Sequence, residues 1–260
     1  MDKKRNSVEF KVTGRYALFA DPVTRVGGEK FSYQVPTYQA LKGILESIFW
    51  KPTFIWYIDA VRVINKIQTE SKGIKTLQSD GIYPSLKNPK KKEAALTDLS
   101  YYTYLRDVEY QVLAHFDWNY QRENLKDDRN EYKHHNIAKR SIKKGGRRDT
   151  FLGTRECQGY VEQCCFGEGE SFYDNYGELD FGVMFHGYDY PDETGKNELS
   201  ARLWRAKMEN GIIRFPLPKG DWDSSMRRPI RKMTVKEFEN NRNFTLIDND
   251  LTVADLLKEE

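Results

Sequence analysis

The 260-residue sequence predicts an α+β fold built on a ferredoxin-like domain, the split βαβ, RRM-like arrangement. Segments with the alternating pattern of strands and segments with helical periodicity follow in the order strand, helix, strand, strand, helix, strand. After Glu168 the pattern changes to short strands with a turn signal at Glu209-Asn210-Gly211. The sequence therefore predicts a four-stranded sheet with two helices, followed by a small C-terminal antiparallel β-sheet.

The first strand and the first helix have local signals. Apolar and polar residues alternate from Val8 to Phe19, which predicts a strand. Thr37 is of the residue type that caps helix N-termini, and the helix must end before Pro52 because the residue that precedes a proline disfavours the helical region. Between these limits, four apolar residues at positions i, i+3, i+4 and i+7 predict a buried stripe. The stripe consists of Leu41, Ile44, Leu45 and Ile48.

The remaining elements of the first domain follow in order. Thr53 to Ile67 and Tyr101 to Trp118 are rich in β-branched and aromatic residues, which predicts two long strands. Residues 70–98 between them are polar and interrupted by glycine and proline, so we expect a mobile insertion or a hairpin tip. A basic helix comes next and ends at a Gly-Gly pair, and Phe151 to Val161 returns as a strand.

These elements divide the chain into three predicted parts. Residues 7–165 form the ferredoxin-like domain, with the insertion at about 70–98. Residues 166–247 form a small antiparallel β appendage, and residues 248–260 form an acidic tail that is either a short helix or disordered. The strands expected in the appendage are Leu179–His186, Leu203–Met208 and Gly211–Phe215.

Composition narrows the class of protein. A net charge of +3 and a pI near 8.5 are only mildly basic, so a surface that binds anions must arise from clustering of charge. No apolar run is long enough to cross a membrane, and the N-terminus lacks the pattern of a signal peptide. Three cysteines form no CxxC pair, and their odd number suits a reducing compartment. We therefore expect a soluble cytoplasmic protein without a membrane partner.

The strongest charge cluster runs from Lys133 to Arg148, with seven Lys/Arg and no acidic residue in sixteen positions. Cations near a helix C-terminus are favoured by the helix dipole, and the following glycines allow backbone amides to approach a phosphate. This pattern is typical of an anion-binding segment. A solvated helix face with an ordinary glycine cap is the alternative.

Lys133 and His134 begin this segment and have the chemistry for phosphate transfer. His134 can exchange a proton near neutral pH, and Lys133 can stabilise the added charge of a phosphorane-like transition state. No His/Cys or carboxylate cluster suggests a metal ligand set, so we expect no metal or cofactor and an attack by the 2′-OH of RNA. A hydrogen-bonded structural role is the alternative for His134. It is the interpretation we adopt for His115 and His186, while His135 faces about 100° away from His134 on the helix.

Four sets of motifs, in the same order along residues 8 to 215, resemble a known family. They are Val35 to Ile44 with Trp50-Lys51-Pro52, Asp128 to Glu131 with Lys133-His134, Gly145 to Asp149 with Phe151 to Cys157, and His186-Gly187-Tyr188 with Tyr190-Pro191. The chain is similar to the CRISPR-associated RAMP endoribonucleases of the type I-C system, subfamily d of the Cas-five group.

The resemblance implies a ferredoxin-like domain with a small C-terminal sheet, and cleavage of the CRISPR repeat hairpin in precursor RNA. It also implies that the protein stays on the 5′ handle of the mature guide RNA, beside the backbone and large subunits of the interference complex. Binding of duplex DNA is left open. The residues that we expect to bind RNA are Lys139, Arg140, Lys143, Lys144, Gly145, Gly146, Arg147, Arg148 and Arg155.

The family's catalytic trio is a tyrosine near the end of the first helix together with the Lys-His pair. Lys133 and His134 match, but Phe49 occupies the tyrosine position and has no hydroxyl. Two hypotheses follow. The first is a metal-independent endoribonuclease that leaves a 2′,3′-cyclic phosphate, and the second is a non-catalytic guide-RNA-binding subunit. A generic ferredoxin-like RNA-binding module is disfavoured, because no aromatic RNP signature lies on a predicted central strand.

Overall fold

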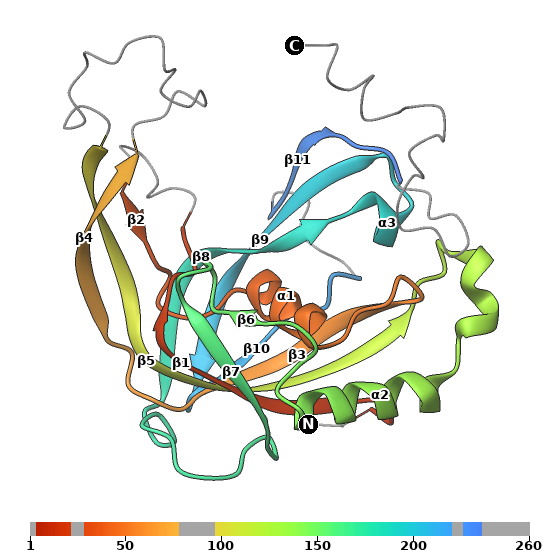
Figure 1. The fold of residues 1–260 in the computed structure, drawn as a ribbon, viewed down its shortest axis with the longest axis horizontal. Helices are drawn as coiled ribbons and strands as arrows, with labels where there is room; N and C mark the ends of the chain where they lie inside the picture. The colour runs from red at the N-terminus through yellow and green to blue at the C-terminus, as the bar shows by residue number, and fades with distance from the viewer. Residues whose placement is uncertain (1–3, 22–28, 78–96, 220–225, 236–260) are drawn as a thin grey trace, which may run out of the picture.

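The structure is a computed structural model that describes residues 4–21, 29–77, 97–219 and 226–235. The predicted acidic tail and most of the predicted insertion lie outside these ranges. Figure 1 shows a long, strongly curved sheet whose two ends enclose the first helix. The elements of the first half are β1 (Val8–Ala17), β2 (Lys30–Phe31), α1 (Tyr38–Ile48), β3 (Phe54–Val63), β4 (Thr69–Leu77) and β5 (Thr97–Trp118).

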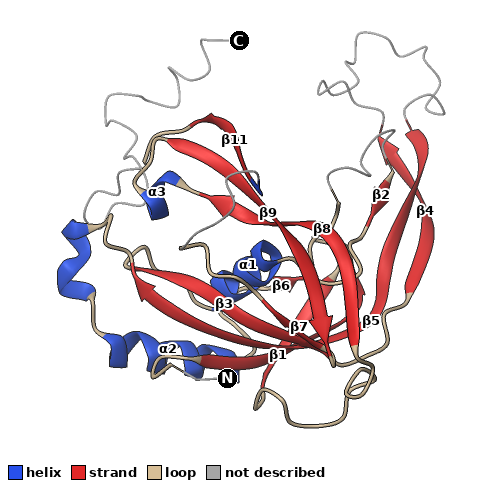
Figure 2. Cartoon of the chain, turned by 180° about the vertical axis from the view of Figure 1, so that it is seen from behind, coloured by secondary structure: helices blue, strands red, loops and turns tan. Residues whose placement is uncertain are grey.

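The second half begins with a short 3-10 helix. It leads into α2, which is the basic helix that the sequence predicts. Strands follow, of which β8 and β9 lie over the side of α1 that faces away from β3 (Figure 2). The elements are η3 (Glu123–Asp128), α2 (Glu131–Lys143), β6 (Thr150–Phe151), β7 (Gln158–Gln163), β8 (Glu178–Asp189), α3 (Pro191–Thr194), β9 (Glu198–Glu209), β10 (Ile212–Arg214) and β11 (Arg227–Lys232).

The fold is a mixed α/β structure with a mostly antiparallel sheet. The strands follow the order β11-β9-β10-β3-β5-β1-β7-β6, and β2, β4 and β8 pair with strands of this path. The central strands β3-β5-β1-β7 pair antiparallel with one another, and among the described strands only β2 runs parallel to its partner, β5. Along the chain, β1, α1, β3, β5, α2 and β7 occur in the predicted order, and β2, β4, η3 and β6 are additional elements between them.

The C-terminal strands correct one expectation, because they do not form a separate small sheet. β10 pairs with β3 through Ile213 and Val61, so β8, β9 and β11 extend the main sheet. The physical reason is that β3 would otherwise present an edge of unpaired backbone groups, which β10 satisfies. The division into domains at residue 165 stays a prediction.

Two further segments differ from the expectation. The predicted insertion begins with β4, which pairs with β5 from Thr69 to Leu77 and was missed because its residues are mostly polar. The strand predicted from Phe151 to Val161 is two strands, β6 and β7, separated by a turn. Gly153 has φ +96° in that turn, and a Cβ there would overlap the carbonyl of Leu18, so only glycine fits.

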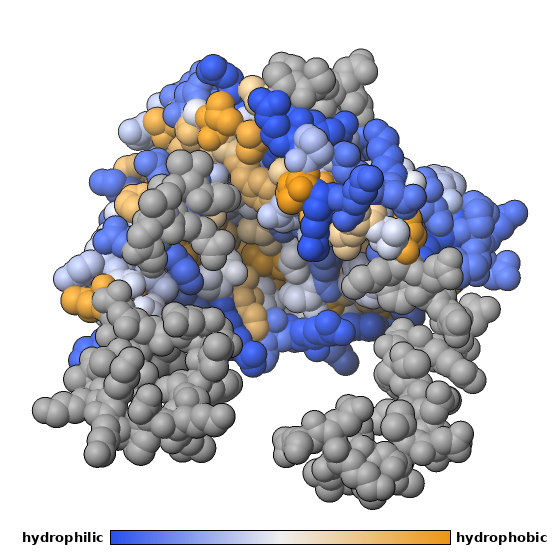
Figure 3. All heavy atoms as spheres, turned by 90° about the horizontal axis from the view of Figure 1, so that it is seen from above, coloured by the Kyte–Doolittle hydropathy of each residue, from blue (hydrophilic) through white to orange (hydrophobic). Residues whose placement is uncertain are grey.

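Helix α1 forms the centre of the core, as the apolar stripe predicts. The Thr37 hydroxyl caps it by accepting a hydrogen bond from the Ala40 N–H at 3.1 Å. The four stripe residues are buried, and each such side chain contributes about 1.5–3 kcal/mol relative to an exposed one. Seen from above, apolar side chains gather in a central strip bordered by hydrophilic ones (Figure 3).

Tyr38 and His186 join α1 to the C-terminal strands. Their rings stack with centroids 4.2 Å apart. His186 is fully buried; its Nε2 donates to the Pro216 carbonyl at 3.1 Å, and its Nδ1 accepts from Arg202 Nε at 3.3 Å. Burial and the Arg202 charge lower the pKa of His186 to about 2, although the Pro216 carbonyl opposes them. These contacts match the structural role that the sequence suggested.

We expect this histidine to make folding stability depend on pH. In the folded chain His186 stays neutral far below 6.5, its ordinary pKa, whereas the unfolded chain takes up a proton there. The unfolded state therefore binds more protons below pH 6.5, and stability falls by about 1.4 kcal/mol per pH unit on acidification. Urea unfolding at pH 7.5 and 5.5 measures this loss, and His186→Gln should lose less between the two pH values. Equal losses in the two proteins would contradict this assignment.

Candidate active site and basic surface

Lys133 lies in the first turn of α2, where its side chain is half exposed. Asn130 caps this helix, because its side-chain oxygen accepts a hydrogen bond from the Lys133 N–H at 3.0 Å. The Lys133 ammonium donates to Asp128 Oδ1 at 2.6 Å. The salt bridge holds the ammonium at the surface, near the point where η3 leads into α2.

His134 is fully buried, unlike its neighbour Lys133. Its Nε2 lies 2.7 Å from the Asp128 carbonyl oxygen and 3.3 Å from Asp128 Oδ2. Since both atoms are acceptors, Nε2 carries a proton. Nδ1 is buried and has no hydrogen-bond partner within the described ranges. Nδ1 is therefore the ring nitrogen that is left to exchange a proton with a substrate.

Asp128 connects these groups, although the sequence suggested no role for it. Besides Lys133 and His134, it accepts a hydrogen bond from the Thr53 hydroxyl at 2.8 Å. Burial raises the pKa of Asp128, but the hydrogen bonds from Lys133 and Thr53 outweigh burial and lower it overall. The carboxylate therefore stays ionised and positions both predicted catalytic residues. Its position just before the cap of a basic helix was the available sequence signal.

Phe49 lies beside His134, which places the position of the family tyrosine in the same cluster. It follows α1 in extended conformation and is only 1% exposed. Its ring stacks on His134 with centroids 6.0 Å apart and a 27° interplanar angle, and it also contacts Phe54 at 5.5 Å. The Arg147 guanidinium lies over the Phe49 ring, 4.8 Å from its centroid. Phe49 thus connects the buried histidine with the basic loop.

The basic residues predicted to bind RNA lie at the surface. α2 ends at Lys143, and Gly145 and Gly146 continue with φ +81° and +105°. A Cβ on Gly146 would lie 3.2 Å from the Arg148 carbonyl oxygen and close to Ile48 of α1, so the glycine lets this loop approach α1. Every charged member of the predicted set is exposed: Lys139, Arg140, Lys143, Lys144, Arg147, Arg148 and Arg155.

Two adjoining clefts open on this surface and share Arg147, Arg148 and Asp149. One has a volume of about 370 Å³ and lies between this loop and α1, with Phe49 in its wall. The other has a volume of about 720 Å³ and lies between the loop and β7, where Tyr160 is 61% exposed. Basic groups beside exposed aromatic rings are typical of surfaces that bind single-stranded nucleic acid. No pattern in the sequence indicates that Tyr160 belongs to this surface.

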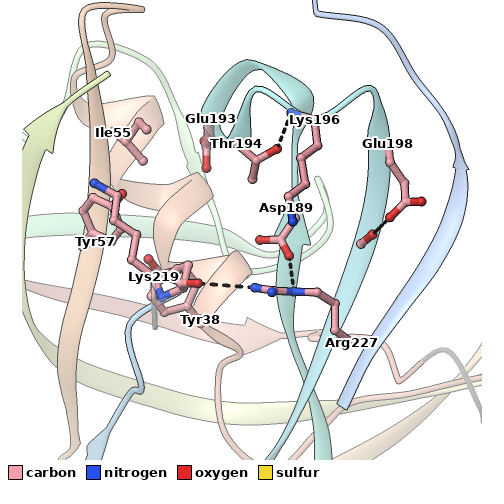
Figure 4. Close-up of a pocket in the computed structure, with 12 residues that line it drawn as sticks. Tyr38, Ile55, Tyr57, Asp189, Glu193, Thr194, Lys196, Glu198, Lys219 and Arg227 are labelled. Atoms are coloured by element: carbon pink, nitrogen blue, oxygen red, sulfur yellow. Dashed lines mark hydrogen bonds and ion pairs between the residues drawn. The ribbon is translucent and has the colours of Figure 1, made fainter. Parts of the chain in front are cut away.

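A third cavity, of about 160 Å³, lies beside Tyr38 at the junction with the C-terminal strands (Figure 4). Asp189 faces Arg227 there at 2.7 Å and also pairs with the buried Arg202. The lining charges balance, and none of the residues predicted to act on RNA lies in this cavity. The structure therefore separates it from the basic surface.

Most of the chain matches the model of one known protein family. The family model of the CRISPR-associated protein Cas5, of the Cas5d type, matches residues 7–216. The chain belongs to the Cas5d family. This confirms the resemblance that the motifs indicated.

Two curated relatives of this Cas5d-family chain are both named CRISPR pre-crRNA endoribonuclease Cas5d. The one from Mannheimia succiniciproducens is 28% identical over 235 residues, covering 81% of this chain and 95% of the relative. The one from Thermus thermophilus is 30% identical over 197 residues, covering 74% and 78%.

Solved structures also resemble this family member. A structure described as a CRISPR-associated protein has a TM-score of 0.63 and 37% identity, covering 81% of this chain and 91% of the other. A functionally uncharacterized protein, SMU1763c from Streptococcus mutans, has a TM-score of 0.64 and 40% identity, covering 81% and 92%. The fold is therefore shared with chains of similar length.

The described residues of this Cas5d-family chain contain no cluster suited to a metal ion, because no three His, Cys, Asp or Glu side chains lie close enough to ligate one. Over the same residues, no helix has the length and apolar character needed to span a bilayer.

Proposed function

We propose that this chain is an endoribonuclease that cleaves the repeat hairpin of precursor CRISPR RNA. The observation that carries the proposal is that two curated relatives named pre-crRNA endoribonuclease align with it over 95% and 78% of their lengths. The Lys133–His134 pair beside an exposed basic surface supports it. The antiparallel order β3-β5-β1-β7 supports the ferredoxin-like arrangement that many RNA-binding domains use.

The proposed reaction uses the RNA's own 2′-OH and no metal ion. The 2′ oxygen loses its proton and attacks the adjacent phosphorus; the bond from phosphorus to the 5′ oxygen breaks, and that oxygen takes up a proton. The products are a 2′,3′-cyclic phosphate and a 5′-hydroxyl. His134 acts through Nδ1 as the acid or base, and the Lys133 ammonium stabilises the charge on the phosphorus oxygens. Because His134 is buried, RNA binding must displace a neighbouring ring such as Phe49.

We further propose that the chain stays on the 5′ handle of the guide RNA, in a type I-C complex beside the backbone and large subunits. The exposed basic residues from Lys139 to Arg148 would hold the handle, because their charges face solvent rather than the core. Binding of duplex DNA stays a prediction. A handle-binding role requires affinity for the cleaved product as well as for the precursor.

A non-catalytic RNA-binding subunit is the second candidate, and two observations favour it. Phe49 cannot give or take a proton, and His134 has no exposed surface in this conformation. Incubation of the purified protein with its own repeat RNA in EDTA distinguishes the candidates. The enzyme cuts the hairpin at one position, whereas the non-catalytic subunit binds the hairpin and leaves it intact.

Phe49→Tyr should accelerate cleavage at least several-fold. The substitution adds one oxygen to a ring that already packs between Arg147 and His134, so its steric cost is small. A buried hydroxyl without a partner would cost about 1–3 kcal/mol of stability, but a bound phosphate supplies one. Single-turnover rates in EDTA and hairpin affinities of both proteins measure the effect. A stable variant that is no faster than an active parent would mean that another group already fills the role.

A further inference from the structure

Gly43 is unusual because it lies inside α1 at a position that nothing in the packing requires to be glycine. It is exposed, and a Cβ built on it would meet no atom within 4 Å. Glycine in a helix interior is destabilising relative to alanine. No positive φ or close backbone contact explains it. Gly43 lines the 370 Å³ cleft beside Phe49, so its missing side chain keeps that cleft open.

The same helix face supplies the other components of the cleft. Gly43, Glu46 and Ser47 lie on the face of α1 opposite the buried stripe, and Trp50, which follows the end of the helix, lines the same cleft. The Trp50 side chain is 46% exposed, which leaves part of a large aromatic surface available for stacking. Stacking of bases on aromatic side chains is a common source of affinity in single-stranded RNA recognition. This face thus has an aromatic platform, an open floor and a carboxylate.

The opposite wall of the cleft carries two arginines and one carboxylate, that of Asp149. Arg147 and Arg148 line it and are exposed, and neither forms an ion pair with a carboxylate in the described part of the chain. Arg147 lies over the Phe49 ring, so its position is set by packing. Two guanidiniums without carboxylate partners match the phosphate of a nucleotide. The cleft therefore offers phosphate binding on one wall and base stacking on the other.

From this arrangement we propose that the cleft binds one unpaired guanine nucleotide of the RNA, next to the catalytic cluster. The inference rests on the proposed function and specifies its substrate. Guanine is the base whose Watson–Crick edge presents two adjacent donors, N1–H and N2–H, which one carboxylate accepts together. Glu46 supplies that carboxylate; it lines the cleft and is held 3.9 Å from Lys42. Adenine and uracil place an acceptor where Glu46 requires a donor, and cytosine offers one donor only.

The test uses four RNA pentamers that differ only in the central base: UUGUU, UUAUU, UUCUU and UUUUU. Each competes with labelled repeat RNA for the full-length protein. We expect the guanine pentamer to compete at least about 5-fold more strongly than the others, the lower end for a bidentate base contact. Gly43→Leu fills the floor and Glu46→Gln removes the charged acceptor, so each should reduce the guanine preference below 2-fold.

Gly43→Ala is the graded comparison, because its methyl group fills less of the cleft than leucine does. It should retain more guanine preference than Gly43→Leu. Both residues favour helix more than glycine, so the melting temperatures should not fall. Equal competition by the four pentamers, or an unchanged preference in Gly43→Leu, would overturn the guanine site. Failure of the parent to bind the repeat RNA itself would instead overturn the proposed function, and the inference with it.

Discussion

His134→Gln should lower the single-turnover cleavage rate of repeat RNA by about 10²–10⁴-fold, the usual effect of losing a general acid or base. Glutamine can still donate a hydrogen bond toward the Asp128 carbonyl, which His134 Nε2 contacts at 2.7 Å. It cannot exchange a proton near neutral pH. The substitution therefore separates the catalytic role of His134 from its structural role, which His134→Ala would not do.

His135→Gln is the matched control, because the Nε2 of this adjacent histidine also lies at hydrogen-bond distance from a backbone carbonyl, that of Ser7 at 2.9 Å. We expect hairpin affinity within a few-fold of the parent for both variants, since His134 acts on the transition state. An unchanged rate in a folded His134→Gln protein would remove His134 from the mechanism. The buried histidine would then be a structural residue.

Removal of four charges from the loop after α2 should weaken RNA binding most strongly. The quadruple alanine variant of Lys143, Lys144, Arg147 and Arg148 removes side chains that are all exposed, so folding should be preserved. Each phosphate contact contributes about 0.7–0.9 to the slope of log affinity against log salt. Four lost contacts should therefore reduce the slope by about 3.

The control for total charge removes four exposed basic residues from β9, β10 and β11, which lie at the opposite end of the strand order from β7, the strand beside the loop after α2. Binding isotherms between 50 and 200 mM salt compare the two variants with the parent. An unchanged slope in the loop variant, or an equal loss in the control, would mean that the loop is an ordinary solvated face. The control residues are Arg205, Lys207, Arg214 and Lys232.

Elements with local signals could be predicted from the sequence. Thr37 caps α1 and the four-residue stripe is buried, because both depend on residues within a few positions of each other. The Gly-Gly pair likewise follows the end of α2. The pairing of β10 with β3 was not predictable, since it joins residues far apart in sequence that share no pattern. β4 was missed because a polar strand paired along one edge lacks apolar alternation.

The candidate site was predictable in composition and not in geometry. The charges of the basic loop follow from its sequence, and the structure exposes them. The burial of His134 depends on Phe49, Phe54 and Trp118, which three different elements bring to one place. Periodicity along α2 does not reveal this packing. The exposed Tyr160 and the open floor at Gly43 also emerge only when the loop, α1 and β7 come together.

In the proposed reaction, this chain cleaves repeat RNA by attack of the substrate's own 2′-OH. The most direct test compares the repeat RNA with the same RNA carrying a single 2′-deoxy nucleotide at the cut position, in EDTA. We expect the first RNA to be cut and to leave a 2′,3′-cyclic phosphate, whereas the second binds equally well and stays intact. Cleavage of the deoxy substrate, or no cleavage of the all-ribose substrate, would contradict it.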